Sequence, residues 1–182
     1  MFHKPRGVIV SRSDERNRRT VYDCLPHWVY SDGWQPVGRL DRDSRGLLLF
    51  TQDGQLLELL TRPHTISKTY DIWLRGRLTA EHLAQLSAGI PSRGEILTVQ
   101  KIILLGTAGP KTHLQVIIDE GKNRHLRRLF CSLKDPQHGT PLKVIELKRI
   151  AIGPIQLDIP SGAWRLLSTG EIDELRMAAE KT

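Results

Sequence analysis

The sequence predicts an α+β fold, with a mixed, mostly antiparallel sheet and flanking helices. Short apolar or alternating segments, typical of strands, are interspersed with segments that repeat their apolar residues at helical spacing. At least two connections between strands are of the hairpin type, including the glycine–proline turn at residues 106–111. The 182 residues suffice for one substantial domain or for two small lobes that share a core.

The first predicted elements are short. Val8–Val10 is a β-branched run that predicts a strand, and the polar residues 11–20, SRSDERNRRT, predict an exposed loop. The arginines of this loop could clamp phosphates or simply be hydrated. Val21–Leu25 predicts a short helix that Pro26 ends.

A core strand, a capped helix and an alternating strand follow. Gly46–Thr51 is an apolar run of strand length, and Asp53 is placed to cap a helix that ends before Pro63. Thr69–Arg75 alternates between apolar and polar positions, which predicts a half-buried strand. The residues on its apolar face are Tyr70, Ile72 and Leu74.

The middle of the chain predicts a helix and a hairpin. Thr79–Ala88 has helical character, and Gly89 lies just past its end. Ile96–Leu105 and Thr112–Asp119 are the two strands expected on either side of the glycine–proline turn.

The next helix carries a basic residue beside its apolar stripe. Asn123 is placed to cap it, and its stripe consists of Leu126, Leu129, Phe130 and Leu133. Arg127 lies on the flank of this stripe, half in and half out. An arginine that only snorkels at the edge of a core helix is the alternative to a functional role here.

The last predicted elements are a strand and a helix. Val144–Ile152 is an apolar run of strand length. Ser168 and Glu171 form a capping box for a final helix that ends near Glu180.

Composition and charge favour a nucleic-acid partner. Apolar residues make up 39% and charged residues 26% of the chain, as in globular domains, while the formal charge is +7. The basic residues are concentrated near the N-terminus and after residue 121, which favours a polyanionic partner. A long apolar run and an amphipathic basic helix are both missing from the sequence, so a membrane is not expected as the partner.

Cysteine and histidine spacing predicts neither a metal site nor a disulfide. Cys24 and Cys131 lie far apart, and the histidines show no ligand spacing. The first residues have no apolar segment like that of a secretion signal. We therefore expect a cytoplasmic protein that binds no metal, and we expect a monomer because the chain has no coiled-coil seam.

The segment GRLDRDSRGLLLFTQDG (38–54) places an acidic residue, Asp41, between Arg39 and Arg42 just before the core strand. A solvated loop is one interpretation of such a cluster. The alternative is a carboxylate that works in a closed pocket, where a nearby cation is needed to keep it ionised.

Three separated segments resemble one enzyme family. They are HKPRGV (3–8), the segment 38–54 and EGKNRHLRRLF (120–130), together with KTY (68–70) and LKRIAIGPIQL (147–157). In this order they resemble the RsuA/RluB/RluE/RluF class of pseudouridine synthases, over residues 2–167. The resemblance implies the pseudouridine synthase fold, with two lobes around a central cleft, and an enzyme that isomerises uridine in structured RNA without a cofactor.

The resemblance also implies roles for individual residues. Asp41 matches the catalytic aspartate, Tyr70 the tyrosine that stacks on the target base, and Arg127 the basic residue that pairs with the aspartate. Arg39 is similar to the arginine that helps to fill the gap left by a flipped nucleotide. The residues expected to contact RNA are Lys4, Arg16, Arg18, Arg19, Arg39, Arg42, Lys122, Asn123, Arg124, Lys148 and Arg149.

The chain departs from the family at two points. His125 stands where the family usually has glutamine, and the chain begins at the catalytic strand, without the S4-like domain of many relatives. This organisation is most similar to the RluE type. We expect a single catalytic domain over 1–182, with approximate lobes 1–66 and 67–167 and a C-terminal helix over 168–180.

Ribosomal RNA of the large subunit, 23S, is the expected substrate, with small-subunit 16S RNA and tRNA as alternatives. A non-catalytic RNA-binding module would explain the positive charge, but it would not explain an acidic residue among arginines, because an anion repels phosphate. A metal-dependent nuclease would need clustered carboxylates, and Asp41 with Asp43 gives little support for one. The sequence does not distinguish whether Asp41 attacks the base, attacks the sugar or removes a ribose proton.

Overall fold

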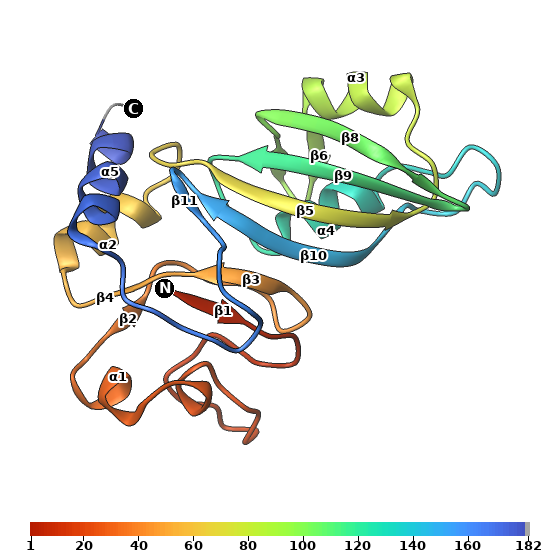
Figure 1. Ribbon diagram of the computed structural model, residues 1–182. Helices are drawn as coiled ribbons and strands as arrows, with labels where there is room; N and C mark the ends of the chain where they lie inside the picture. Colours follow the sequence, from red (N-terminus) through yellow and green to blue (C-terminus); the bar gives the residue numbers. More distant parts are fainter. Residues whose placement is uncertain (181–182) are drawn as a thin grey trace. The chain divides into compact units, whose positions relative to one another are not determined.

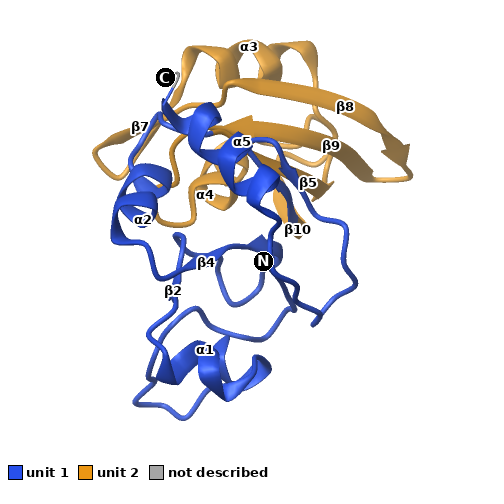
Figure 2. Ribbon diagram, turned by 60° about the vertical axis from the view of Figure 1, so that its left-hand side comes forward, with its two compact units in different colours: residues 1–66, 148–182 blue, residues 67–147 orange. Residues whose placement is uncertain are grey.

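The computed structural model describes residues 1–180, which form two compact units (Figure 2). Unit 1 contains residues 1–66 and the chain from Lys148 onward, and unit 2 contains Ser67–Leu147. The α+β class and the mixed, mostly antiparallel pairing are confirmed. The expected lobes, 1–66 and 67–167, stay a prediction; the compact units differ from them in that residues 148–167 belong to unit 1. That the whole chain acts as one catalytic domain stays a prediction.

Strand pairing explains why the late residues belong to unit 1. Strand β3 (Arg45–Leu48) lies between β1 (Phe2–Lys4), which is antiparallel to it, and β10 (Lys143–Ile152), which is parallel to it (Figure 1). The parallel register pairs Lys148 with Arg45 and Arg149 with Gly46. Strand β11 (Ile155–Gln156) then pairs with the end of β10. The second half of β10 therefore completes the sheet of unit 1.

The other elements of unit 1 are short, and one prediction fails there. They are η1 (Tyr22–Cys24), α1 (His27–Ser31), the paired β2 (Gln35–Pro36) and β4 (Phe50–Thr51), α2 (Gly54–Thr61) and α5 (Thr169–Glu180). Val8–Val10 is not a strand, because only Ile9 forms a bridge, to Thr20. The short helix predicted before Pro26 is confirmed: η1 ends at its C-cap Leu25, which has an extended backbone, and Pro26 is then the N-cap of α1.

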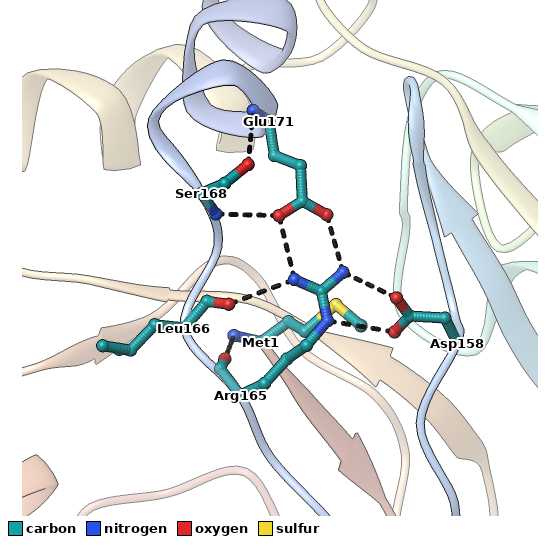
Figure 3. Close-up of polar contacts among 6 residues, drawn as sticks. All are labelled: Met1, Asp158, Arg165, Leu166, Ser168 and Glu171. Atoms are coloured by element: carbon teal, nitrogen blue, oxygen red, sulfur yellow. Dashed lines mark hydrogen bonds and ion pairs between the residues drawn. The ribbon is translucent and has the colours of Figure 1, made fainter.

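Both predicted helix caps of unit 1 are confirmed. The Asp53 carboxylate accepts hydrogen bonds from the amides of Gln55 (2.9 Å) and Leu56 (3.0 Å). At α5, the Glu171 amide donates to Ser168 Oγ (3.2 Å) and the Ser168 amide donates to Glu171 Oε2 (2.8 Å; Figure 3). Arg165 holds the same carboxylate and lowers the pKa of Glu171 to about 2.

Unit 2 is an antiparallel sheet with two helices and a small hairpin. Strand β5 (Lys68–Arg75) pairs with β9 (Lys111–Ile118), which pairs with β8 (Lys101–Ala108). The remaining elements are α3 (Ala80–Ala88), the hairpin of β6 (Ile90–Ser92) and β7 (Glu95–Leu97), and α4 (His125–Cys131). The predicted alternation of β5 is confirmed, because Tyr70, Ile72 and Leu74 are buried.

Two details of unit 2 differ from the prediction. The predicted strand Ile96–Leu105 is two strands, β7 and β8, separated by residues 98–100. Asn123 does not cap α4, since Arg124 takes the N-cap position with a left-handed backbone (φ 49°) and no side-chain cap. Among residues 1–180, no helix is both long and apolar enough to cross a membrane.

Candidate active site

Asp41 lies half-buried in a turn that leads directly into β3. The Ser44 amide donates to the Asp41 carbonyl (3.0 Å) and closes this turn. Two hydrogen bonds join the turn to the segment after β1: the Gly7 amide donates to the Arg42 carbonyl (2.8 Å), and Arg42 Nε donates to the Gly7 carbonyl (3.3 Å). The backbone of the loop is therefore fixed at Asp41 and at the residue that follows it.

Lys4 is a buried cation in the same unit. It is fully buried, and its Nζ donates to the carbonyls of Ser44 (2.8 Å) and Pro5 (3.0 Å). Burial lowers the pKa of Lys4 to about 8, and the negative charges of Asp41 and Asp43 oppose this shift. The prediction that Lys4 contacts RNA is therefore wrong: the residue supports the Asp41 loop from inside, because its amine satisfies two carbonyls there.

Arg149 is also structural. It is 3% exposed, and its Nε donates to the Leu47 carbonyl (2.7 Å) on the neighbouring strand. Its backbone lies against Gly46, where an added Cβ would be 2.5 Å from the Arg149 nitrogen. Arg149 therefore holds β10 to β3 and is not placed to contact phosphate.

The two other predicted catalytic residues lie in unit 2. Tyr70 is 7% exposed on the covered face of β5, opposite Val116 of β9. Arg127 is half-buried on α4, as its position beside the apolar stripe predicts, and its Nη1 donates to the Val144 carbonyl (3.1 Å). This hydrogen bond to Val144 holds the Arg127 side chain in one orientation relative to α4.

Two neighbours of Arg127 hold α4 in place. His125 is buried and its Nε2 lies 2.9 Å from the Thr98 carbonyl. Burial lowers the pKa of His125. The Arg128 guanidinium donates hydrogen bonds to Ser92 Oγ (3.1 Å) and to the Glu95 carboxylate (2.9 Å) of the β6–β7 hairpin. The structural role of Arg128 was missed, because its partners lie more than thirty residues away.

The remaining predicted RNA contacts differ in how freely they reach solvent. Those that are exposed are Arg16, Arg18, Arg19, Arg39, Arg42, Asn123 and Arg124, whereas Lys122 and Lys148 are half-buried. Arg18 is held by Asp14 in an ion pair that lowers the pKa of Asp14 to about 2. Lys122 donates to the Ile96 carbonyl (2.7 Å) and pairs with Glu120 (2.9 Å).

Residues 1–132, which include Asp41, Tyr70 and Arg127, match the family described as RNA pseudouridylate synthase. The chain belongs to this family. A crystal structure of a pseudouridylate synthase is similar to this family member with a TM-score of 0.82 and 31% identity, covering 96% of this chain and 71% of that one. The pseudouridine synthase fold is thereby confirmed. A structure described as an H/ACA RNP bound to a substrate RNA shares the fold at a TM-score of 0.61 and 19% identity, over 86% of this chain and 48% of that one.

Several curated relatives of the chain are named ribosomal large subunit pseudouridine synthase B. The protein of Vibrio cholerae serotype O1 is 35% identical over 182 residues, covering 98% of this chain and 54% of that protein. The protein of Haemophilus influenzae is 34% identical over 179 residues, covering 97% and 48%. The chain spans about half the length of these relatives. The resemblance to the RsuA/RluB class is confirmed, and the RluE type stays a prediction.

Proposed function

We propose that this protein isomerises a uridine to pseudouridine in ribosomal RNA, with Asp41 as the catalytic carboxylate. The observation that carries the proposal is the position of Asp41. It lies in a turn whose backbone is fixed by Ser44 and Gly7, within the segment that matches the RNA pseudouridylate synthase family.

The reaction requires such a carboxylate. The bond between uracil N1 and the ribose must break, the base must turn, and a bond from C5 to the ribose must form, with no net gain or loss of atoms. A carboxylate held close to sugar and base can act as nucleophile or as base in this sequence. Half-burial of Asp41 removes part of its hydration, and a cation beside the carboxylate would compensate for that loss.

Arg127 is proposed as the cation that pairs with Asp41 in the enzyme–RNA complex. A guanidinium can form two parallel hydrogen bonds to a carboxylate, which fixes its direction better than an ammonium group does. Lys4 contributes a second positive charge from within unit 1. We infer that Lys4 positions the loop, whereas Arg127 acts on the carboxylate.

Tyr70 and Arg39 are proposed to handle the nucleotide. A base inside a helix is out of reach, so the enzyme must flip it out, which costs a few kcal/mol. Stacking on an aromatic ring offsets roughly 1–3 kcal/mol of that cost. Tyr70 would supply the ring, and the exposed Arg39 would occupy the gap that the base leaves.

Large-subunit ribosomal RNA is the proposed substrate, because the curated relatives are named for it. The exposed arginines at positions 16, 19, 42 and 124 are proposed as phosphate contacts, together with the half-buried Lys122 and Lys148. Such contacts do not depend on sequence and weaken as salt rises. We propose a cytoplasmic monomer that needs no metal or other cofactor.

The test is pseudouridine formation on transcripts of large-subunit RNA, with and without a chelator. The proposal expects activity in both, and expects Asp41→Asn to lower it by at least a thousandfold. Asp43→Asn is the matched control, since this exposed acid stands two residues away and should matter little. Undiminished activity of Asp41→Asn would exclude the assigned role. If the protein modified only small-subunit RNA or tRNA, the proposal of large-subunit RNA as the substrate would be wrong.

A further inference from the structure

The exposed face of the unit 2 sheet carries a stacked pair of rings. Trp73 of β5 and His113 of β9 are cross-strand partners, and their rings lie 4.3 Å apart with an interplanar angle of 4°. His113 Nε2 lies 2.8 Å from Asp71 Oδ2, so the imidazole is held in one orientation. The side chains of His113 and Asp71 remain 27% and 28% exposed. The apolar core of unit 2 lies on the opposite face of the sheet, so the stacked rings are not part of that core.

The opposite face of the same strands is covered. Ile72 and Leu74 of β5 and Leu114 and Val116 of β9 are all 0% exposed. Side chains of a strand alternate between the two faces, so Trp73 and His113 point away from this apolar layer. Figure 1 shows α4 on the far side of these strands.

Beside the rings lies a pair of like charges. Arg75 and Lys111 are directly opposite each other in the β5–β9 register, two residues beyond Trp73 and His113 and therefore on the same face. Both are exposed, and neither side chain has a hydrogen-bond or ion-pair partner within residues 1–180. Like charges directly opposite each other destabilise a sheet, so this pair is a cost to the free protein. An anion placed between them would remove that cost.

On its other side, the His113 ring borders an open space. The residue of β8 in register with His113 is Gly106, next to an irregularity in the strand between Leu104 and Gly106. A Cβ added at Gly106 would meet no atom within 4 Å. The face of the imidazole turned away from Trp73 therefore has room beside it for a flat group.

We propose that this face of unit 2 is a second RNA contact, at which an unpaired base stacks on His113 above Gly106. A phosphate of the same strand then lies against Arg75 and Lys111. Aromatic side chains on an exposed sheet, flanked by cations, are a recurrent way of binding single-stranded RNA. Asp71 does not oppose this, because it lies on the other side of the rings from the two cations and its carboxylate faces the imidazole. This inference rests on the proposed action on RNA and adds a place where substrate RNA is held.

The test measures binding of the full chain to a short single-stranded RNA oligonucleotide. His113→Ala is expected to weaken binding about tenfold, because one stacked base contributes on this order. His113→Phe keeps a ring and should stay within about twofold of the wild type, which separates stacking from loss of structure. Gln115→Ala, next along β9 on the same face, is the matched control and should bind like the wild type. Replacing both Arg75 and Lys111 by Gln should reduce the slope of log K against log salt by about 0.7, the value for one phosphate of a single strand.

Crosslinking and activity complete the test. RNA that contains 4-thiouridine should crosslink to peptides of β5, β8 or β9 in the wild type, and less in His113→Ala. Equal binding and equal crosslinking in the wild type and His113→Ala would overturn the proposal, and the face would then serve some other partner, such as an acidic protein. Pseudouridine formation is measured in parallel. If the wild type forms pseudouridine but His113→Ala binds RNA equally well, only the proposed contact at His113 is contradicted. If His113→Ala weakens RNA binding but the wild type forms no pseudouridine, only the proposed isomerase activity is contradicted.

Discussion

Gly46 of β3 and Arg149 of β10 approach so closely that no side chain fits between their backbones. Gly46 has φ +117°, and a Cβ added there would lie 2.5 Å from the Arg149 nitrogen and even closer to the Arg149 carbonyl oxygen. Both obstacles are backbone atoms, so neither can rotate away. Gly46 is therefore the point that joins the strand after Asp41 to its parallel neighbour.

Gly46→Ala is expected to lower the free energy of unfolding by about 3 kcal/mol, because overpacking and an unfavourable φ act together. The displaced β3 should also move the Asp41 turn and abolish pseudouridine formation. Chemical denaturation and the activity assay measure the two effects. Gly54→Ala is the control, since an added Cβ there meets nothing and the residue is the first of α2. A Gly46→Ala protein as stable as wild type would contradict the close approach.

Lys4 should make stability rise with pH in the alkaline range. Its pKa is lowered to about 8, so the folded protein releases this proton at lower pH than the unfolded chain, whose value is near 10.5. Between these values the unfolded state binds more protons, and the free energy of unfolding therefore rises with pH. Lys4→Met should remove this rise, and Lys101→Met, at an exposed position, should keep it. Denaturation curves from pH 7 to about pH 10 measure it. Parallel curves for the wild type and Lys4→Met would contradict the shift.

Arg127 and Arg124 should separate catalysis from binding. Arg127→Ala is expected to lower turnover by at least a hundredfold while the affinity for RNA changes only a few-fold, because the proposed role is toward Asp41. Arg124→Ala should do the reverse: it should weaken binding and reduce the salt slope by about 1, with turnover at saturating RNA unchanged. Single-turnover rates and binding curves over a salt series measure both. Equal losses of turnover and affinity in Arg127→Ala would count against the pairing.

Tyr70 should act through its ring. Tyr70→Phe keeps the aromatic face and should retain most activity, whereas Tyr70→Ala should lose at least tenfold through lost stacking. Because Tyr70 is 7% exposed, thermal melting must accompany the assay. A nearly inactive Tyr70→Phe of normal stability would show that the hydroxyl carries the role.

Asp135 should cause acid sensitivity. Its buried carboxylate accepts hydrogen bonds from the amides of Arg77 (2.9 Å), Gln137 (2.8 Å) and His138 (3.1 Å), which lower its pKa to about 2. A lowered carboxyl pKa stabilises the fold above about pH 4, and this stabilisation disappears as pH falls toward 2. Asp135→Asn should melt at a lower temperature at pH 7, with the difference shrinking in acid. The exposed Asp173→Asn serves as the comparison, and a constant difference at every pH would contradict the assignment.

Local signals predicted the elements that depend on local contacts. The caps at Asp53 and Ser168 and the alternation of β5 were confirmed because their hydrogen bonds and burial follow from nearby residues. The loop of Asp41 was found through its motif. Partners distant in sequence decided the failures: the Ser44 carbonyl binds Lys4, and the Leu47 carbonyl binds Arg149 from 102 residues away. A pattern of charges cannot distinguish an arginine that faces solvent from one that closes a parallel strand pair.

During translation, β3 can pair with β10 only after the ribosome has synthesised β10, so the Asp41 loop cannot reach its folded structure before then. Leu47 and Arg149 are 102 positions apart, so at about 5–20 residues per second the ribosome needs roughly 5–20 s to deliver the second partner after the first. Until then, the strand that follows Asp41 has an open edge and exposed apolar side chains. Nascent or truncated chains that stop before Lys148 should therefore be inactive and prone to capture by chaperones.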